Sequence, residues 1–477
     1  MMNRRAFLRG GGGGAGGAVF AGRGVLGANG DIRAAVIGLG NKGGQHAQML
    51  SGLDGVRLVG LCEVDPKRLA KHMASAVERG ARPEGSSDPR RVMERDDVDV
   101  VFIAAPNHWH ALLTVWALRA GKHVYVEKPV SHSLWEGERM LEEARRSGKL
   151  VQAGTQYRSC PGLRGASAWL AEGHLGKPLW GQVVWYEHRE PIGRVAGYYP
   201  EGLDYDLWCG PSVMEPLKRP KLHYDWHWVW STGDGDLANS GIHALDACRM
   251  FLPGAVYPDR VVSVGGRFTY DDAAETPNTQ FTALDYGGLP VVIENRNLST
   301  VTDGVVMGDF RRIREGIVVQ YEGGYFAGLR TGGEVYDNEG RSVRKFRGDG
   351  GGGHHANFFA ALRSGRAGDL NAPLEGGVVS SGVCHLGNLS YRLGREGGVA
   401  ECRAVLGGGE VVEGAFGRTL EALAGLGLKT GLMRFRVGAA LNVDRGSGEI
   451  TRAGDVGMEV VRGMVRGHQR APFEFPA

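Results

Sequence analysis

The sequence predicts an α/β protein with a doubly wound parallel sheet on its N-terminal side and a second, mixed α/β domain after it. Two observations carry this prediction. Short apolar runs alternate with helical segments from residue 32 to residue 148, which is typical of parallel strands joined by helices. The chain also has 477 residues, more than one hydrophobic core usually serves. We therefore expect two main domains.

The composition is that of an ordinary soluble globular protein, with 42% hydrophobic and 23% charged residues. The net charge is +3, and the first 30 residues hold four arginines and no acidic residue, so the rest of the chain is close to neutral. This balance argues against a nucleic-acid partner. The six cysteines are dispersed without CxxC spacing and therefore indicate neither a metal site nor a disulfide framework.

The first 30 residues resemble a twin-arginine export signal. Arg4 and Arg5 are followed by Phe7 and Leu8, and a glycine- and alanine-rich stretch comes next. That stretch is too short and too polar to span a bilayer. We expect residues 1–30 to be a signal segment that directs the folded protein to the periplasm. The alternative is a disordered glycine-rich tail on a cytoplasmic protein.

A strand, a glycine turn and a helix follow one another directly after this segment. Residues 32–37, IRAAVI, lead into GLGNKG, and a helical stretch comes next. Gly38 permits a tight turn, Gly40 lets the backbone approach a phosphate, and Gly43 allows the helix to pack closely on the strand. Together with Asn41, they would place the free amides of the helix N-terminus beside a pyrophosphate. The pattern predicts a dinucleotide site.

A carboxylate at the end of the next strand supports this interpretation. The run VRLVGLCEVD, residues 56–65, places Glu63 twenty residues after Gly43. A carboxylate there accepts hydrogen bonds from a ribose diol and repels a 2′-phosphate, so NAD is expected rather than NADP. Asp65 is a fallback for the same role. The alternative is an acidic strand end that only caps the helix beginning at Pro66.

The alternation of strands and helices then continues to residue 148. The expected strands are residues 98–106 and 123–129, and the expected helices are residues 107–121 and 133–148. Ligands of such sheets gather beyond the carboxyl ends of the strands. The polar side chains expected at those ends are Asn107, His108, His110, Glu127 and Lys128. Helix capping and surface ion pairing are the alternative roles for these side chains. The dinucleotide domain is expected to cover residues 31–155.

Several motifs resemble those of the Gfo/Idh/MocA oxidoreductase family. They are AAVIGLGNKG, AAPNHWH, HVYVEKP, GTQYR, GDLANSGIHALD and HLGNLSYRLG, spread over residues 32–395. The resemblance implies an NAD-binding Rossmann domain followed by an α+β domain, residues 156–395, built on a large open and mainly antiparallel sheet. Strand-like runs such as RVVSVGGRFTY and PVVIENRN agree with that sheet. It also implies a homo-oligomer formed through the sheet. We expect residues 396–477 to pack on the second domain.

The resemblance further implies two catalytic residues. Lys128 matches the lysine of the family's EKP motif, and His243 matches the acid/base histidine of the GxH motif. Family members that resemble inositol dehydrogenase often carry an aspartate four residues before this histidine, and Asn239 stands there in this chain. An asparagine can orient a hydroxyl but cannot accept its proton, so His243 is expected to carry the proton alone. Asp246, three residues beyond His243, is expected to be an orienting carboxylate at the substrate or a structural one.

Further substrate contacts are expected from two segments. Residues 204–230 contain four tryptophans, of which Trp208 and Trp230 are the candidate platforms for the apolar face of a sugar. Burial in the core is the alternative. In the GTQYR motif, Gln156 and Arg158 are expected at the substrate edge, with Arg158 as a bidentate clamp. The pair His354 and His355 indicates the start of a helix and not a metal site.

Three functional hypotheses follow. The first is an NAD-dependent oxidoreductase that acts on the CH–OH group of a sugar, polyol or glycoside. The second is a redox-neutral glycosidase resembling the α-N-acetylgalactosaminidases of the family, in which transient oxidation acidifies a neighbouring C–H and allows elimination of the glycosidic oxygen. The third is a non-catalytic sugar-binding protein with the same fold. The presence of both Lys128 and His243 disfavours the third hypothesis.

Overall fold

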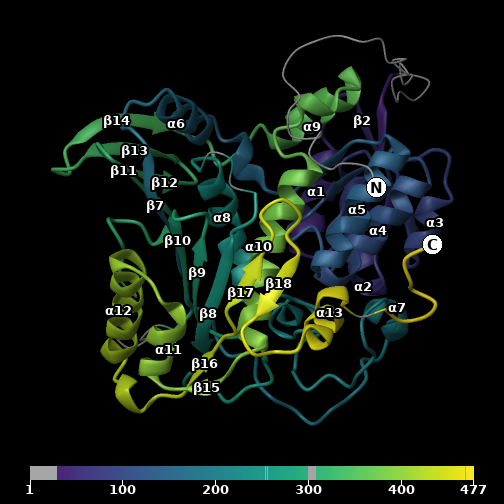
Figure 1. Cartoon of the computed structure of the whole chain (residues 1–477). Coiled ribbons are helices and arrows are strands. Elements are labelled where there is room, and N and C mark those ends of the chain that lie inside the picture. Colours follow the sequence, from purple (N-terminus) through teal and green to yellow (C-terminus); the bar gives the residue numbers. More distant parts are fainter. Residues whose placement is uncertain (1–29, 253, 255, 299–307, 468, 477) are drawn as a thin grey trace, which may run out of the picture.

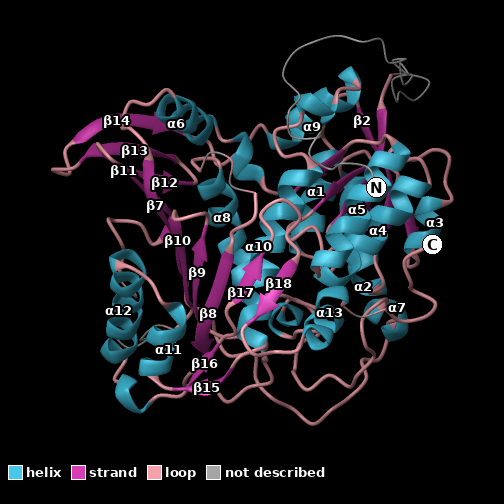
Figure 2. Cartoon of the chain, viewed as in Figure 1, coloured by secondary structure: helices cyan, strands magenta, loops and turns pink. Residues whose placement is uncertain are grey.

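A computed structural model of the chain describes residues 30–252, 254, 256–298, 308–467 and 469–476. One half of the molecule holds a small parallel sheet covered by helices, and the other half holds a larger sheet (Figures 1 and 2). The twin-arginine motif lies outside the described residues. No helix in the described ranges is long and apolar enough to cross a membrane.

The N-terminal sheet has six strands in the order β3-β2-β1-β4-β5-β6, and each neighbouring pair is parallel. The strands are β1 (Ile32–Ile37), β2 (Val56–Cys62), β3 (Glu84–Ser86), β4 (Val100–Ile103), β5 (His123–Val126) and β6 (Val151–Ala153). The helices are α1 (Asn41–Leu50), α2 (Pro66–Glu78), α3 (Pro89–Met93), α4 (Asn107–Arg119) and α5 (Leu134–Ser147).

Local sequence accounts for most of these boundaries. Strands β4 and β5 consist only of buried residues, as expected for strands covered by helices on both faces. Three helices begin after a side chain that accepts hydrogen bonds from their first amides: Asp65 caps α2, Asp88 caps α3 and Ser133 caps α5. Helix α1 begins at Asn41, inside the glycine motif, a few residues earlier than its apolar pattern alone predicts.

The second sheet has twelve strands within the described part of the chain. Its main path runs β14-β13-β12-β11-β7-β10-β9-β8-β16-β15, and β17 and β18 attach beside β8. Only the β7–β10 pair is parallel among its described pairings. The strands are β7 (Pro178–Tyr186), β8 (Arg260–Gly266), β9 (Thr279–Asp285), β10 (Pro290–Arg296), β11 (Glu315–Tyr321), β12 (Gly324–Leu329), β13 (Gly332–Asp337), β14 (Ser342–Arg347), β15 (Arg395–Gly397), β16 (Phe435–Val437), β17 (Leu441–Val443) and β18 (Ile450–Ala453). The predicted fold class is confirmed.

Helices cover both faces of this sheet. The helices that follow the N-terminal domain in the chain are α6 (Pro161–Ala171), α7 (Tyr205–Cys209), α8 (Ile242–Arg249), α9 (His354–Ser364), α10 (Leu374–Arg392), α11 (Val399–Leu406), α12 (Glu410–Gly425) and α13 (Met458–Arg466). Short helical turns occur at Gln156–Ser159, Asp225–Trp228, Leu237–Gly241, Ala367–Asp369 and Thr430–Leu432. On β8, Val261 packs with α8 and α10, while Val262 points to the opposite face and packs with α11 and α12. Helix α10 runs through the centre of the molecule between the two sheets (Figure 1).

Segments distant in sequence return to the N-terminal domain. Helix α9 inserts Phe358 and Phe359 into the core formed by β1 and β4. The segment after residue 396 first adds β15–β18 to the second sheet, and its last residues then lie on the N-terminal domain, where the Phe473 ring contacts Trp109 at 5.4 Å between centroids. Residues 396–477 therefore contact both halves of the molecule.

Candidate functional site

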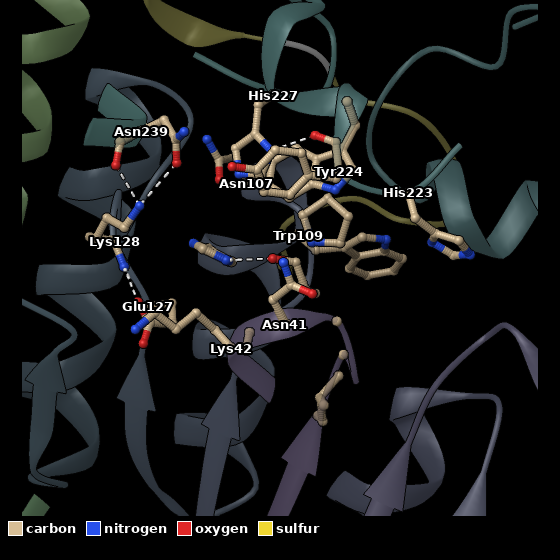
Figure 3. A pocket seen from close by; sticks show the side chains of 18 of the residues that line it. Asn41, Lys42, Asn107, Trp109, Glu127, Lys128, His223, Tyr224, His227 and Asn239 are labelled. Atoms are coloured by element: carbon tan, nitrogen blue, oxygen red, sulfur yellow. Dashed lines mark hydrogen bonds between the residues drawn. The ribbon is translucent and has the colours of Figure 1, made fainter. Parts of the chain in front are cut away.

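A cavity of about 480 Å³ opens at the carboxyl ends of β1, β2, β4 and β5. Its floor comes from the N-terminal domain, and its roof comes from the second domain. Figure 3 shows Asn41 and Lys42 approaching from below and Tyr224 and His227 from above. Parallel sheets bind ligands at this edge because several loops converge there without blocking one another.

The glycine turn at one end of the cavity has a geometry that side chains would destroy. Gly38 has φ +82°, and a Cβ added there would lie 2.5 Å from the backbone nitrogen of Ala105. A Cβ on Gly43 would lie 1.7 Å from the carbonyl oxygen of Gly38. Gly40 differs, because its Cβ would meet nothing closer than Arg68 Nη1 at 3.8 Å. The first two glycines let the turn close, and Gly40 leaves open space in front of the α1 N-terminus.

Glu63 joins this turn to the end of β2. Its Oε2 accepts a hydrogen bond from the Leu39 amide at 2.7 Å, and its Oε1 accepts one from the Asp65 amide at 3.1 Å. A carboxylate has about four acceptor positions, so two remain for hydroxyls of a bound ribose. Asp65 is instead the N-cap of α2 and is paired with His223 Nε2 at 2.8 Å. The geometry favours Glu63 over Asp65 for the ribose.

The polar residues after β4 hold the neighbouring loops in place. Asn107 Nδ2 donates to Asp234 Oδ2 at 2.9 Å, and the ring nitrogens of His110 lie 2.7 Å from the Ala105 carbonyl and 2.6 Å from the Pro129 carbonyl. His110 therefore links the loops that follow β4 and β5. His108 does not line the cavity; its ring nitrogens face the Thr232 and Trp208 carbonyls, and burial lowers its pKa to about 3.

Asp234 also forms a buried ion pair with His132, whose Nδ1 lies 2.9 Å from Asp234 Oδ2. Burial alone would lower the pKa of His132, but the Asp234 carboxylate outweighs burial and raises this pKa to about 9. The imidazolium is therefore charged at neutral pH, and the pair ties the loop after β5 to the segment before α8.

Lys128 is held by the irregular turn that precedes α8. Its Nζ donates to the Asn239 carbonyl at 2.5 Å and to Asn239 Oδ1 at 3.1 Å (Figure 3). Asn239 belongs to a π-helical turn, Leu237–Gly241, and such turns often occur at functional sites. Burial lowers the pKa of Lys128 to about 8. The third N–H of the ammonium group remains for a ligand oxygen in the cavity.

Glu127, the residue before Lys128, is fixed from below. Its Oε1 lies 3.0 Å from His46 Nε2, and both side chains are buried. Burial raises the pKa of Glu127, but the contact with His46 outweighs it and keeps this pKa well below its usual range. An ionised carboxylate thus lies beside Lys128 and favours its charged form.

His243 has an uncommitted ring nitrogen. Its Nδ1 is buried and makes no hydrogen bond to any described residue. The ring packs against Tyr157 and Trp185, with centroids 5.3 and 6.4 Å away. Burial and, second, the Lys128 ammonium keep the pKa of His243 well below its ordinary value. A neutral imidazole facing the cavity can accept a proton.

Residues 187–230 form a long connection that covers the cavity. His223 reaches Asp65 at the start of α2, as described above. The carbonyl of Trp208 accepts hydrogen bonds from His108 Nε2 and Trp109 Nε1, both at 3.1 Å. The covering segment is therefore attached to the N-terminal domain at two points, Trp208 and His223.

Most predicted site residues line the cavity. They are Gly38, Gly40, Asn41, Glu63, Asn107, His110, Glu127, Lys128, Gln156, Trp208, Asn239 and His243. Gly43 lies directly behind the turn.

Three predicted substrate residues lie elsewhere. Arg158 Nε is bound to both carboxylate oxygens of Asp246, at 2.9 and 2.8 Å, and neither residue lines the cavity. The buried Asp246 takes the guanidinium that we expected to clamp a substrate. Trp230 lines a separate small pocket and packs under the Arg392 guanidinium at 5.1 Å.

Several lining residues were not predicted from the sequence. They are Lys42, Tyr157, Trp185, Glu187, Arg189, Tyr224, His227 and Arg330, among others. Lys42 lies inside the glycine motif, and Tyr157 lies inside GTQYR, so both could have been found there. Arg330 follows β12 and carries no local signal, because only the pairing of β12 with β11 and of β11 with β7 brings it to the cavity.

Two family models match the chain. One, described as "Oxidoreductase family, NAD-binding Rossmann fold", matches residues 32–155. The other, "Oxidoreductase family, C-terminal alpha/beta domain", matches residues 185–298. Both belong to the Gfo/Idh/MocA group, and each falls in one of the two domains described above.

Similar proteins include dehydrogenases and glycosyl hydrolases. The scyllo-inositol 2-dehydrogenase (NAD(+)) of Bacillus subtilis is 32% identical over 154 residues, which cover 31% of this chain and 43% of that protein. A glycosyl hydrolase family 109 protein of Saccharopolyspora erythraea is 33% identical over 258 residues, covering 52% and 48%. Each match thus spans less than half of the relative. The structure of levoglucosan dehydrogenase in complex with NADH has the same fold, with a TM-score of 0.57, 16% identity, and coverage of 75% of this chain and 95% of that one.

Proposed function

Because the chain belongs to the Gfo/Idh/MocA oxidoreductase family, we propose that it transfers hydride between NAD and the CH–OH carbon of a sugar, polyol or glycoside. One observation carries this proposal. Lys128 and His243, which come from different domains, line the same cavity as the glycine turn and the α1 N-terminus.

The residues at the turn fit NAD. The open space in front of Gly40 and the free amides of α1 suit a pyrophosphate, and the buried Glu63 offers acceptors to a ribose diol. The same carboxylate disfavours a 2′-phosphate, so the site suits NAD rather than NADP. When bound, NAD supplies the hydride acceptor for oxidation of the alcohol.

Lys128 and His243 act on the substrate hydroxyl in different ways. The Lys128 ammonium, positioned by Asn239, holds the substrate oxygen and stabilises negative charge as it develops there. His243 accepts the hydroxyl proton at a ring nitrogen, because its low pKa keeps it neutral at pH 7. Asn239 cannot take this proton and acts by orienting the lysine.

The test is a panel of free sugars, polyols and nitrophenyl glycosides assayed with NAD, together with identification of any nucleotide that purifies with the protein. Stoichiometric growth of NADH absorbance with a free sugar or polyol supports the proposal. Tight sugar binding without turnover would instead support a non-catalytic binding protein.

A redox-neutral glycosidase is the second candidate function. Asn239 replaces the aspartate often found at this position, and the hydrolase of Saccharopolyspora erythraea matches over a longer stretch than the inositol dehydrogenase. This function predicts release of nitrophenol from aryl glycosides with bound NAD and no net formation of NADH.

We also propose that residues 1–30 direct export by the twin-arginine route, because of the Arg4–Arg5 pair. Fractionation of cells expressing the full chain and a variant with both arginines replaced by lysine tests this, since only the former should reach the periplasm. We further propose a homo-oligomer formed through the second sheet, on which Leu179 of β7 and Val343 of β14 are about half exposed. Light scattering of the purified protein measures the oligomer directly.

A further inference from the structure

The wall of the cavity beside His243 contains an arginine that the proposed chemistry does not use. Arg330 follows β12, and its guanidinium lies over the Trp185 ring at 5.6 Å from the centroid. Trp185 in turn packs beside His243. Arg330, Trp185 and His243 therefore form one continuous surface at the substrate end of the cavity.

Two arginines line this end, and their hydrogen-bonding capacities differ. Arg189 is committed within the protein: it donates to Glu187, Ser240 and the Tyr224 hydroxyl, and its Nε lies 3.4 Å from Asp236. Arg330 has one acceptor among the described residues, Glu315, at 2.7 Å from Nη2. The Nε and Nη1 groups of Arg330 have no acceptor among the residues that the structure describes, so they can donate to a ligand.

Two carboxylates line this end, Glu127 beside Lys128 and Glu187, and Glu187 is already paired. Glu187 Oε2 accepts hydrogen bonds from Trp185 Nε1 at 2.9 Å and from Arg189 Nη2 at 2.8 Å. The groups left for a ligand are mainly donors, namely the third N–H of Lys128 and the open edge of Arg330. After burial, the positive charge of Lys128 is the leading cause of the low pKa of His243; Glu127 opposes it, and Arg330 contributes in the same direction as Lys128. Lys128 and Arg330 thus present N–H donors to the substrate end, where the Glu127 carboxylate beside Lys128 is the opposing charge.

We propose that the substrate carries a carboxylate and that Arg330 recognises it, so that the preferred substrates are acidic sugars such as uronates or aldonates. This inference rests on the proposed oxidoreductase function and names its substrate class. The guanidinium of Arg330, which lies over the Trp185 ring and is paired with Glu315 through Nη2, is planar and keeps N–H groups free, and such a fork suits a carboxylate better than single hydroxyls. Arg330 is then a specificity-determining residue, while Lys128 and His243 perform the chemistry.

The test compares matched neutral and acidic substrates, such as glucose with glucuronate and galactose with galacturonate, in the full-length enzyme with NAD. We expect kcat/KM to be higher for the acid in at least one pair. In Arg330→Gln, kcat/KM for the acid should fall about 10- to 100-fold, mainly through KM, while the value for the neutral sugar stays within about 2-fold. Arg330→Lys should restore part of the loss.

Two further variants sharpen the test. Glu315→Gln removes the carboxylate that competes for Arg330, so it should lower KM for the acid by a few fold. Arg341→Gln is the matched control, because Arg341 is an exposed arginine paired with carboxylates on the same sheet but outside the cavity lining. It should leave both substrates unchanged. Melting temperatures of all variants show whether they fold.

The outcomes separate this inference from the proposed function. Equal losses for acidic and neutral sugars in Arg330→Gln, or no acid that binds or reacts, would overturn the inference even if neutral sugars are oxidised. If acids bind by calorimetry, lose affinity in Arg330→Gln and yet produce no NADH, the carboxylate site stands and the oxidoreductase proposal fails.

Discussion

The cofactor end of the cavity is formed largely by the backbone of one short segment, whereas the catalytic end is formed by side chains from several distant segments. At the cofactor end, Gly38, Gly40 and the start of α1 lie within a few residues of one another. At the catalytic end, Asn239 of the second domain accepts hydrogen bonds from the Lys128 ammonium. Arg330 follows β12, in a different part of the second domain. A backbone site can be specified by local sequence, but a side-chain site needs the whole fold.

The largest expected effects are at the catalytic end. Lys128→Ala and His243→Ala should each reduce turnover by about 10²- to 10⁴-fold, because they remove the charge on the substrate oxygen and the proton acceptor. Binding of NAD, followed by fluorescence titration, should change little in both. Lys345→Ala, at an exposed lysine of β14, is the control. Normal rates in both site variants would remove these residues from the mechanism.

At the cofactor end, the effect of a substitution should depend on the space around the backbone of the glycine turn, because no side chain of the turn takes part in the chemistry. Gly40→Ala adds a Cβ in open space at φ −68°, so stability should be kept while affinity for NAD falls about 10-fold or more through contact with the phosphates. Gly38→Ala forces a Cβ against the backbone of Ala105 at positive φ, so it should lower the melting temperature as well.

Calorimetry and NAD titration of the two glycine variants check this contrast. If Gly40→Ala destabilised the fold as much as Gly38→Ala, the turn would not be open in front of α1. If neither variant altered NAD affinity, the cofactor would bind elsewhere.

The same contrast explains which parts of the fold and of the site could be predicted from the sequence. The alternation of strands and helices predicted the N-terminal sheet, and the glycine motif with Glu63 twenty residues after Gly43 predicted the dinucleotide site, because both depend on local order. Arg158 was predicted as a substrate clamp from its position after the last strand of that sheet. The sequence could not show that Asp246 would be buried beside it, nor that Arg330 would face the cavity, since both outcomes depend on how the second sheet packs.

Replacing Arg158 tests whether this residue stabilises the fold and does not bind substrate, and we expect a small effect on activity. Arg158→Gln leaves Asp246 buried without its main partner, which should cost about 3–5 kcal/mol of stability. KM and kcat at a temperature where the variant is folded should stay within about 2-fold of the parent. Asp246→Asn should also destabilise, and the double variant should cost less than the sum. A large rise in KM without a loss of stability would show that Arg158 binds the substrate.

The smallest expected effect is in the pH profile, where burial at the catalytic end should be visible. The charged form of Lys128 is needed and its pKa is lowered to about 8, so kcat/KM should fall as the pH rises through 8. The neutral form of His243 is needed and its pKa is well below 6.5, so the acid limb should lie below that pH. Lys128→Arg keeps a charge at all accessible pH values and should flatten the alkaline limb, although its rate will be lower. A parent profile that stays flat to pH 10 would show that Lys128 is not buried in the working enzyme. The two ends of the cavity would then differ in which segments supply their groups, and not in how far those groups are removed from water.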